Sequence, residues 1–290
     1  MFMEWLVLAL LYASVGSLAA FLDKVLLNYK INPVSLSSFR LMSNALVALP
    51  LIFLLGFQIP DTNMLMMILA GSVIYSIAAI TYFIALSKDD VSKLIPYRDA
   101  LVTIISFSLA IILLAESTNM YRIAGTIAIA FGGYFVLTNG RIVLPKASTA
   151  LLLMGVTSLL TAIFSVFVKV MLSDTTPMAI IFWNYLFTGM ILFAFNCSRD
   201  RGMQIKTLNR IFSDKKILLT SLSASVFAVV AWYFLFTALG MNNASQVLPI
   251  SGVLPMFVAI EGCLLLKERY GVPRVLATLL VVTGVYALYM

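Results

Sequence analysis

Several charged residues lie inside apolar segments of this chain, where they could recognise or gate a polar solute. The segment SKLIPYRDALVTIISFSLAIILL, residues 92–114, has the composition of a membrane span but contains Pro96, Arg98 and Asp99. An isolated charge within a span costs about 3 kcal/mol on insertion scales, so such charges are usually paired or face a wet cavity. The chemistry that these residues suggest is ionic binding of a solute or ionic closure of a path across a membrane.

Four further charges are expected at a similar depth near the same membrane face: Asp23, Lys24, Arg40 and Glu261. With Arg98 and Asp99 they form a layer whose formal charges cancel. Because adjacent helical residues point about 100° apart, Arg98 and Asp99 are expected to find partners on different helices and to close one side of a central cavity. The alternative is a layer that only joins helices or, as for Lys24, snorkels to headgroups.

The elements that must position these residues are membrane-spanning helices. The chain has 290 residues, of which 62% are hydrophobic and 11% are charged, and its mean hydropathy is +1.05. A soluble domain carries about 25% charged residues. The apolar runs are about 20 residues long, as a helix needs to cross a bilayer. The composition therefore predicts an all-α polytopic membrane protein.

Charge and residue types exclude several functions. The net charge of +7 arises mostly from short loops between spans, which does not indicate a nucleic-acid-binding surface. The chain has no histidine and two cysteines, Cys197 and Cys263, in a pattern that suggests neither a disulfide nor a zinc site. We therefore expect no cofactor and no metal. Residue Glu4 stands where a signal peptide would have a basic residue, so the first apolar run is expected to be a retained helix.

Ten spans are predicted, and they divide into two halves. The predicted spans are 3–25, 34–56, 63–86, 92–114, 119–138, 149–172, 177–196, 217–239, 244–266 and 272–290. A first five-helix repeat, 1–138, is joined by a linker, 139–148, to a second repeat, 149–290. The segment from Cys197 to Lys216 is expected to be a basic surface loop that is helical in part.

The two halves repeat residue types in the same order. The matched positions are Lys24 with Lys169, Pro33 with Pro177, Ala85-Leu86 with Ala238-Leu239, Pro96 with Pro249, Glu116 with Glu268, Gly132 with Gly284, and Tyr134 with Tyr286. Since each half has five spans, the second half must enter the membrane from the opposite side. Such inverted repeats around a central cavity are typical of secondary transporters that work by alternating access.

On these residues the chain resembles the ten-helix, EamA-like branch of the drug/metabolite transporter superfamily. The resemblance covers nearly the whole chain. It rests on the five-helix duplication, the lysine near the end of each first helix, and the proline-to-glutamate spacing of helices four and nine. The exit of helix nine, Lys267-Glu268-Arg269, matches the family's pattern well, whereas Ala115-Glu116-Ser117 matches in part.

The resemblance implies secondary transport of a small amino-acid-like, nucleobase-like or drug-like metabolite. It also implies that helices five and ten lie at the periphery and can mediate a homodimer. Intramembrane acids such as Asp99 and Glu261 permit coupling to protons or another ion. Two alternatives are an intramembrane enzyme, for which no segment presents a clear set of catalytic residues, and a non-transporting receptor or assembly protein, against which the inverted repeat argues.

Other residues are expected to line the cavity or to support it. Pro96 and Pro249 would break their helices and free backbone carbonyls, although a simple packing kink is the alternative. The segment PISGVLP, residues 249–255, encloses Ser251 and Gly252 and is where exposed backbone would meet substrate. Further cavity candidates, through the resemblance, are Tyr82 and Trp232. Structural roles are expected for Lys169, for the glutamates as helix caps, and for the glycines in close packing; these glutamates and glycines are Glu116, Glu268, Gly132 and Gly284.

Basic residues predict the orientation in the cell membrane. They concentrate in the loops after spans one, three, five, seven and nine, here called the odd loops, and are scarce in the even loops and at the termini. This bias predicts cytoplasmic odd loops and external termini. The family resemblance instead implies cytoplasmic termini, so the two indications disagree.

Overall fold

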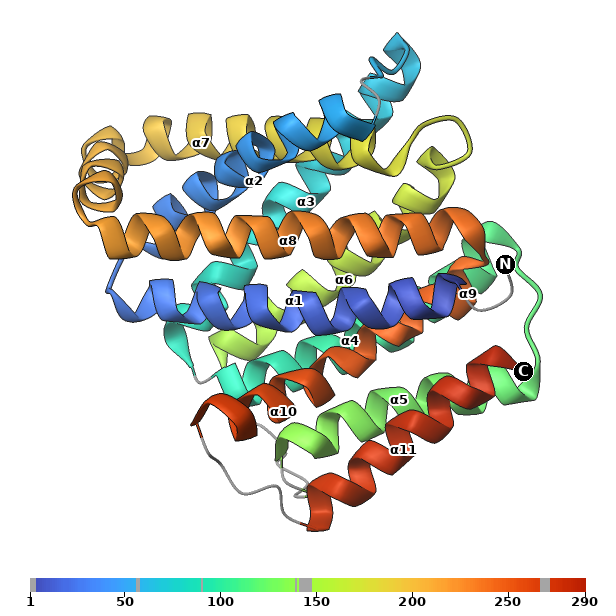
Figure 1. Ribbon diagram of the computed structural model, residues 1–290. Helices are drawn as coiled ribbons and strands as arrows, with labels where there is room; N and C mark the ends of the chain where they lie inside the picture. Colours follow the sequence, from blue (N-terminus) through green and yellow to red (C-terminus); the bar gives the residue numbers. More distant parts are fainter. Residues whose placement is uncertain (1–3, 56–57, 90, 139, 141–147, 267–271) are drawn as a thin grey trace.

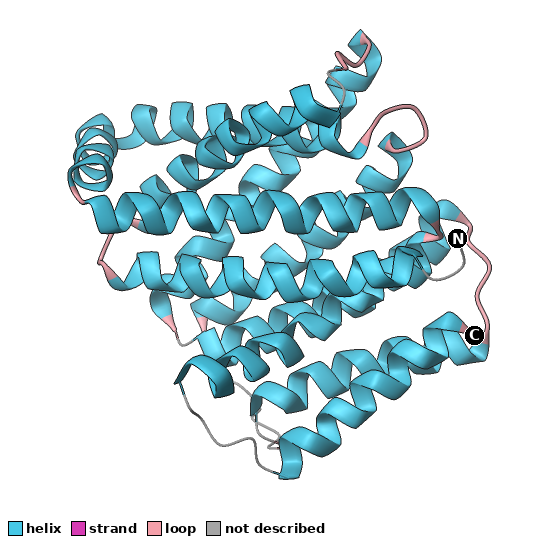
Figure 2. Cartoon of the chain, viewed as in Figure 1, coloured by secondary structure: helices cyan, strands magenta, loops and turns pink. Residues whose placement is uncertain are grey.

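The structure is a computed structural model that describes the chain except residues 1–3, 56–57, 90, 139, 141–147 and 267–271, and except the side chains of 91–93, 96, 137 and 262–266. The described residues form helices joined by short connections, without strands (Figures 1 and 2). The helices are α1 (Glu4–Asn28), α2 (Pro33–Leu55), α3 (Thr62–Lys88), α4 (Val91–Leu114), α5 (Met120–Thr138), α6 (Thr149–Met171), α7 (Pro177–Ser213), α8 (Lys215–Met241), α9 (Ala244–Val247), the 3₁₀ helix η1 (Leu248–Val253), α10 (Leu254–Leu266) and α11 (Val272–Tyr289).

The helices confirm the predicted fold class of a polytopic helical protein. Within the described ranges, nine helices are long and apolar enough to cross a membrane, and Met120–Val136 is a shorter apolar helix. Polar caps explain where several of them begin. The side chains of Asp61, Ser148, Thr176 and Asp214 accept hydrogen bonds from backbone N–H groups in the first turns of α3, α6, α7 and α8. These caps satisfy donors that have no partner within the helix.

Helices of one half pack mainly on helices of the other half. The pairs α1 with α8, α2 with α7, α3 with α6, and α5 with α11 are in contact. Figure 1 shows α1 beside α8, and α5 beside α11 at one edge of the bundle. The N-terminal end of α1 and the C-terminus lie at the same end of the bundle, on the right in Figure 1, as an even number of spans requires. The space at the centre of the bundle is therefore enclosed by both halves.

Matched hydrogen bonds repeat across the two halves. Arg40 and Asn184 each lie seven residues after the matched prolines that begin α2 and α7. Arg40 Nη1 donates to Ser225 Oγ on α8 (2.6 Å), and Ser72 Oγ on α3 donates to Asn184 Oδ1 (3.0 Å). The two serines are themselves at matched positions. The contact between α2 and α8 thus recurs between α7 and α3, as inverted repeats require.

Two elements differ from the expected spans. Helix α7 continues through Ser213, with a non-helical residue, Asp200 (φ −157°, ψ 84°), between the membrane part and a basic helical extension. The predicted ninth span is divided into α9, η1 and α10, because Pro249 and Pro255 remove helical donors on either side of a glycine. Helix α4 is unbroken around Pro96, whose side chain lies outside the described residues. The expected paired break is therefore seen in the second half alone.

Glycines allow α5 and α11 to pack closely. A Cβ atom built on Gly132 would lie 2.7 Å from Val281 Cγ2, and one built on Gly284 would lie 2.8 Å from the carbonyl oxygen of Gly125. Real side chains do not approach so closely, so a larger residue would push the helices apart. Both glycines have the packing environment that their sequence pattern indicated.

Candidate functional site

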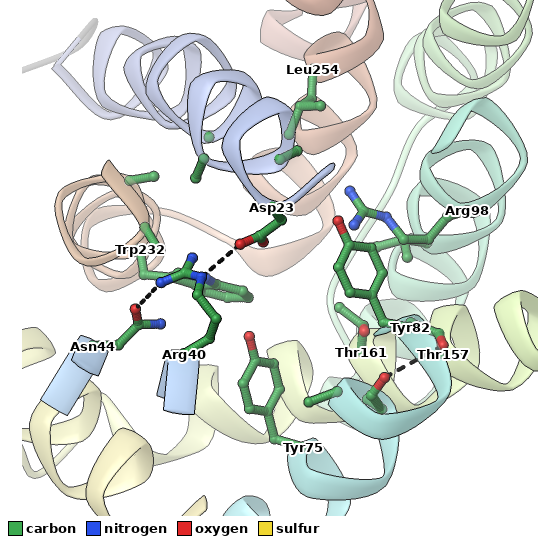
Figure 3. Close-up of a pocket in the computed structure, with 18 of the residues that line it drawn as sticks. Asp23, Arg40, Asn44, Tyr75, Tyr82, Arg98, Thr157, Thr161, Trp232 and Leu254 are labelled. Atoms are coloured by element: carbon green, nitrogen blue, oxygen red, sulfur yellow. Dashed lines mark hydrogen bonds and ion pairs between the residues drawn. The ribbon is translucent and has the colours of Figure 1, made fainter. Parts of the chain in front are cut away.

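A cavity of about 150 Å³ lies at the centre of the bundle. Its walls come from α1, α2, α3 and α4 in the first half and from α6, α7, α8, η1 and α10 in the second. Tyr82 and Trp232, which the sequence suggested as cavity residues, both line it, as does Ser251. Figure 3 shows Tyr75 and Tyr82 extending into it from α3, with Arg40 and Asp23 on one side and Arg98 on the other. The wall is thus polar and aromatic and contains both signs of charge.

Arg40 is held by partners on three helices. Its Nε atom donates to Asp23 Oδ1 on α1 (2.6 Å), and its Nη1 atom donates to Asn44 Oδ1 (3.0 Å) (Figure 3). The Nη1 atom also donates to Ser225 Oγ on α8. The Arg40 side chain is 3% exposed. A buried charge that loses its partner costs several kcal/mol, so these contacts hold α1, α2 and α8 together. The pair forms part of the wall of the cavity.

Arg98 and Asp99 pair with each other, which corrects the expectation that each has a partner on another helix. Arg98 Nε and Nη2 lie 2.7 and 2.6 Å from Asp99 Oδ1. The 100° separation holds for the Cβ directions, but the long arginine side chain bends back around the helix. The guanidinium lies 5.3 Å from the centre of the Tyr82 ring, and Asp99 Oδ2 is buried without a hydrogen bond in the described part of the chain. Asp99 therefore keeps an oxygen with unused bonding capacity beside the cavity.

Aromatic side chains close the end of the cavity that faces the even loops. The ring centroids of Trp232 lie 5.9 Å from Tyr12, 5.9 Å from Tyr75 and 5.2 Å from Phe236, while Phe164 lies 4.8 Å from Tyr75. Edge-on and tilted contacts at these distances stabilise aromatic clusters. Closure of the odd-loop side by charges stays a prediction. Here the charged pairs line the cavity, and the aromatic cluster forms its floor.

The turn between α8 and α9 is fixed by two charged side chains. Lys169 Nζ on α6 donates to the carbonyl oxygens of Leu239 (2.6 Å) and Asn242 (2.7 Å), at the end of α8. The carboxylate of Glu116 accepts from the backbone N–H groups of Ala244 (2.8 Å) and Ser245 (2.7 Å), at the start of α9. A cation at a helix C-terminus and an anion at an N-terminus are both stabilised by the helix dipole. Glu116 thus makes the helix-end contact that the sequence suggested.

The other predicted residues lie apart from the cavity. Lys24 lines a separate hollow at the odd-loop end, and Glu261 accepts a hydrogen bond from Ser17 Oγ on α1 (2.5 Å). Pro249 is buried in η1, and Gly252 packs against Thr103 on α4 and Ile129 on α5 rather than facing the cavity. Glu268 lies outside the described residues. Of the six charges expected in one layer, four line the cavity, whereas Lys24 and Glu261 do not.

Several cavity residues were not singled out in the sequence. They include Tyr12, Asn44, Tyr75, Thr157 and Thr161. The repeat contained a signal for some of them, since Tyr12 and Thr157 stand twelve residues before the matched lysines, Lys24 and Lys169. Within the ranges that the structure describes, no group of three His, Cys, Asp or Glu side chains could hold a metal ion.

Comparisons with known proteins agree with this architecture. The model of the family described as "EamA-like transporter family" matches residues 3–138 and 148–290. The "Uncharacterized protein MJ1333.1" of Methanocaldococcus jannaschii is 31% identical over 84 residues, and the match covers 29% of this chain and 61% of that protein, less than two thirds of its length. A protein of known crystal structure superposes with a TM-score of 0.74 at 13% identity, over 99% of this chain and 94% of the other, which shows a shared fold. The chain belongs to the EamA-like transporter family.

Proposed function

We propose that the protein is a secondary transporter that moves a small organic metabolite across the cell membrane by alternating access. The observation that carries this proposal is the central cavity, whose wall is built by both halves and contains two ion pairs. In inverted-repeat transporters the substrate binds at the interface of the repeats, and rocking of one half against the other exposes the site to each side in turn.

The size and charge of the cavity favour a small neutral or zwitterionic solute. Pockets for drug-sized ligands usually measure about 300–1,000 Å³, so the cavity in this conformation better suits an amino-acid-like or nucleobase-like metabolite. The Asp23–Arg40 and Arg98–Asp99 pairs each have a formal charge of zero. A solute with a large net charge would meet no compensating charge in such a wall.

Within the cavity, Arg98 and Asp99 are the side chains that we assign to the substrate. Their pair keeps a buried carboxylate oxygen without a partner among the described residues, and Arg98 keeps its Nη1 donors. The ring of Tyr82, under the guanidinium, adds an apolar surface for the rest of the solute. Asp99 and Glu261 are also the acids that would carry a coupling proton, which a pH gradient applied to proteoliposomes would test.

A ligand screen with a matched variant tests this function. Purified protein is screened against neutral, zwitterionic and anionic metabolites for a rise in its melting temperature, and the hits are tested for saturable flux in proteoliposomes. We expect Arg98→Gln to remove the thermal shift and the flux, while Arg122→Gln, an arginine at the even-loop end and outside the cavity lining, leaves both unchanged. Hits that bind equally to both variants would refute the assigned site. Absence of saturable flux for every bound solute would instead favour a receptor or assembly protein.

A further inference from the structure

A second hollow lies at the odd-loop end of the bundle, apart from the central cavity. It measures about 600 Å³ and is bounded by the end of α1, the start of α2, the end of α3 and the basic extension of α7. Four cationic side chains line it: Lys24, Lys30, Lys206 and Arg210. Among the described residues that line this basic hollow, none is acidic. A concave surface with an excess of positive charge attracts anionic ligands.

The three lysines have no counter-ion in the described part of the chain. No hydrogen bond or ion pair joins the ammonium groups of Lys24, Lys30 and Lys206 to another described side chain. In contrast, Lys169, the repeat partner of Lys24, donates to two backbone carbonyl oxygens. The hydroxyl and amide groups of Ser87, Thr207 and Asn32 stand in the same lining. The amide of Asn32 and the hydroxyl of Thr207 supply donors of the kind that hold anionic oxygens, whereas the Ser87 hydroxyl donates to the carbonyl oxygen of Ile84 (2.8 Å).

The backbone of the hollow is fixed in place. Lys30 has a left-handed conformation (φ 55°), which is uncommon for a residue other than glycine. Arg210 Nη2 donates to the carbonyl oxygen of Tyr29 (2.7 Å), and Arg210 Nη1 lies 3.5 Å from that of Lys30, so the extension of α7 holds this turn. Arg210 therefore positions Lys30 beside the hollow, whereas Lys24 and Lys206 approach it from α1 and α7.

We propose that the basic hollow binds a phosphate group, either free phosphate or the headgroup phosphate of an anionic lipid. Free phosphate presents more acceptor oxygens and more negative charge than a carboxylate, and a lipid phosphodiester presents one negative charge to the same lysines. Ammonium groups bind phosphate as point charges and do not need the planar geometry of arginine. Leu27, Ile31, Leu86 and Met203 also line the hollow, and its volume exceeds that of a phosphate ion, which leaves room for an attached organic group. The site is independent of the transport function proposed above.

Binding to matched charge variants tests the site. The hollow variant is Lys24→Gln/Lys206→Gln, and the control variant is Lys215→Gln/Lys216→Gln, which removes the same charge from exposed residues at the nearby start of α8. In one arm, calorimetry measures inorganic phosphate binding to delipidated protein. In the other, native mass spectrometry counts phosphatidylglycerol retained from nanodiscs, with phosphatidylcholine as the neutral lipid.

At about 1 kcal/mol for each lysine, the hollow variant should bind the phosphate group about thirtyfold more weakly, and the control variant nearly as well as wild type. The arm that shows the loss identifies the source of the phosphate. Equal losses in both variants, or no binding in either arm, would overturn the proposal. If the hollow variant fails to fold, Lys206→Gln alone should still weaken binding, and Lys24→Arg/Lys206→Arg should retain it.

Discussion

The two ends of the central space differ although the repeats that build them correspond. Five residues before the matched lysines, the first half has Ala19 and the second half has Phe164. Six residues before the matched Ala-Leu pairs, the first half has Ala79 and the second half has Trp232. The alanines line the cavity, and the aromatic residues fill the end that faces the even loops. The same backbone symmetry thus gives one end lined by small side chains, here called the alanine-lined end, and one filled end, because the side-chain volumes differ.

A second difference concerns how the two halves use matched polar positions. Arg40 is charged and is paired with Asp23, whereas Asn184, at the matched position, is neutral and bonds to Ser72. A buried ion pair and a neutral hydrogen bond respond very differently to loss of one partner. The halves are therefore expected to differ in how much they tolerate substitution at equivalent sites.

The largest effect is expected at Arg40. The change Arg40→Met leaves the carboxylate of Asp23 without its partner, so the free energy of unfolding should fall by about 3–5 kcal/mol. The matched change Asn184→Ala should lower it by about 1 kcal/mol, the net contribution of a typical hydrogen bond. Unfolding in detergent measures both. Equal losses in free energy of unfolding for the two variants would contradict the proposed difference between the halves. The double variant Asp23→Asn/Arg40→Met should recover part of the stability that Arg40→Met loses.

An intermediate effect on stability is expected when the alanine-lined end of the cavity is filled. The change Ala79→Trp places an indole where the first half has a methyl group, and overpacking of this kind destabilises by about 1–3 kcal/mol. We expect a folded protein that no longer shows ligand-induced thermal shifts. The corresponding change in the other half, Trp232→Ala, should enlarge the space without blocking it. Retained ligand binding in Ala79→Trp would mean that this wall does not enclose the substrate.

A smaller effect is expected at the turn between α8 and α9. The change Glu116→Gln removes the charge that holds the N-terminus of α9, and loss of a helix cap costs about 0.5–2 kcal/mol. Folded yield, measured by size exclusion, should fall more than ligand affinity. Asp174→Asn, at an exposed acid on the same face, is the control and should change neither. Normal yield with lost transport would show that Glu116 acts in the transport cycle instead.

The last prediction concerns which end of the bundle faces the cytoplasm. The substitution that tests it should leave the stability of the protein unchanged. On a background with Cys197 and Cys263 replaced by serine, Ser213→Cys places one thiol at an exposed position on the basic extension of α7. Because basic loops face the cytoplasm, an impermeant reagent should label it in lysed cells and not in intact cells. Labelling of intact cells would mean that the alanine-lined and filled ends face the opposite sides of the membrane from those predicted, and the fold would be unaffected.

The amino-acid sequence by itself determined the helices and their duplication. Lipid leaves no water to satisfy backbone groups, so long apolar runs must be helices, and polar caps such as Asp61 and Asp214 mark their starts. The matched residues of the two halves then predicted inverted repeats. The packing of α1 on α8 and of α3 on α6 is the arrangement that follows. These features depend on local composition and on a repeat, both of which can be read along the chain.

Only the tertiary structure decided which side chains meet. Whether Arg98 pairs with Asp99 or with another helix depends on the path of a long flexible side chain, which helical periodicity does not fix. Likewise Pro96 and Pro249 are matched in the sequence, but only the segment with a second proline and Gly252 departs from α-helix. The filled end depends on rings from α1, α3, α6 and α8 that meet across the halves. Which residues far apart in the chain come into contact depends on how the helices pack against one another, and local sequence does not specify that packing.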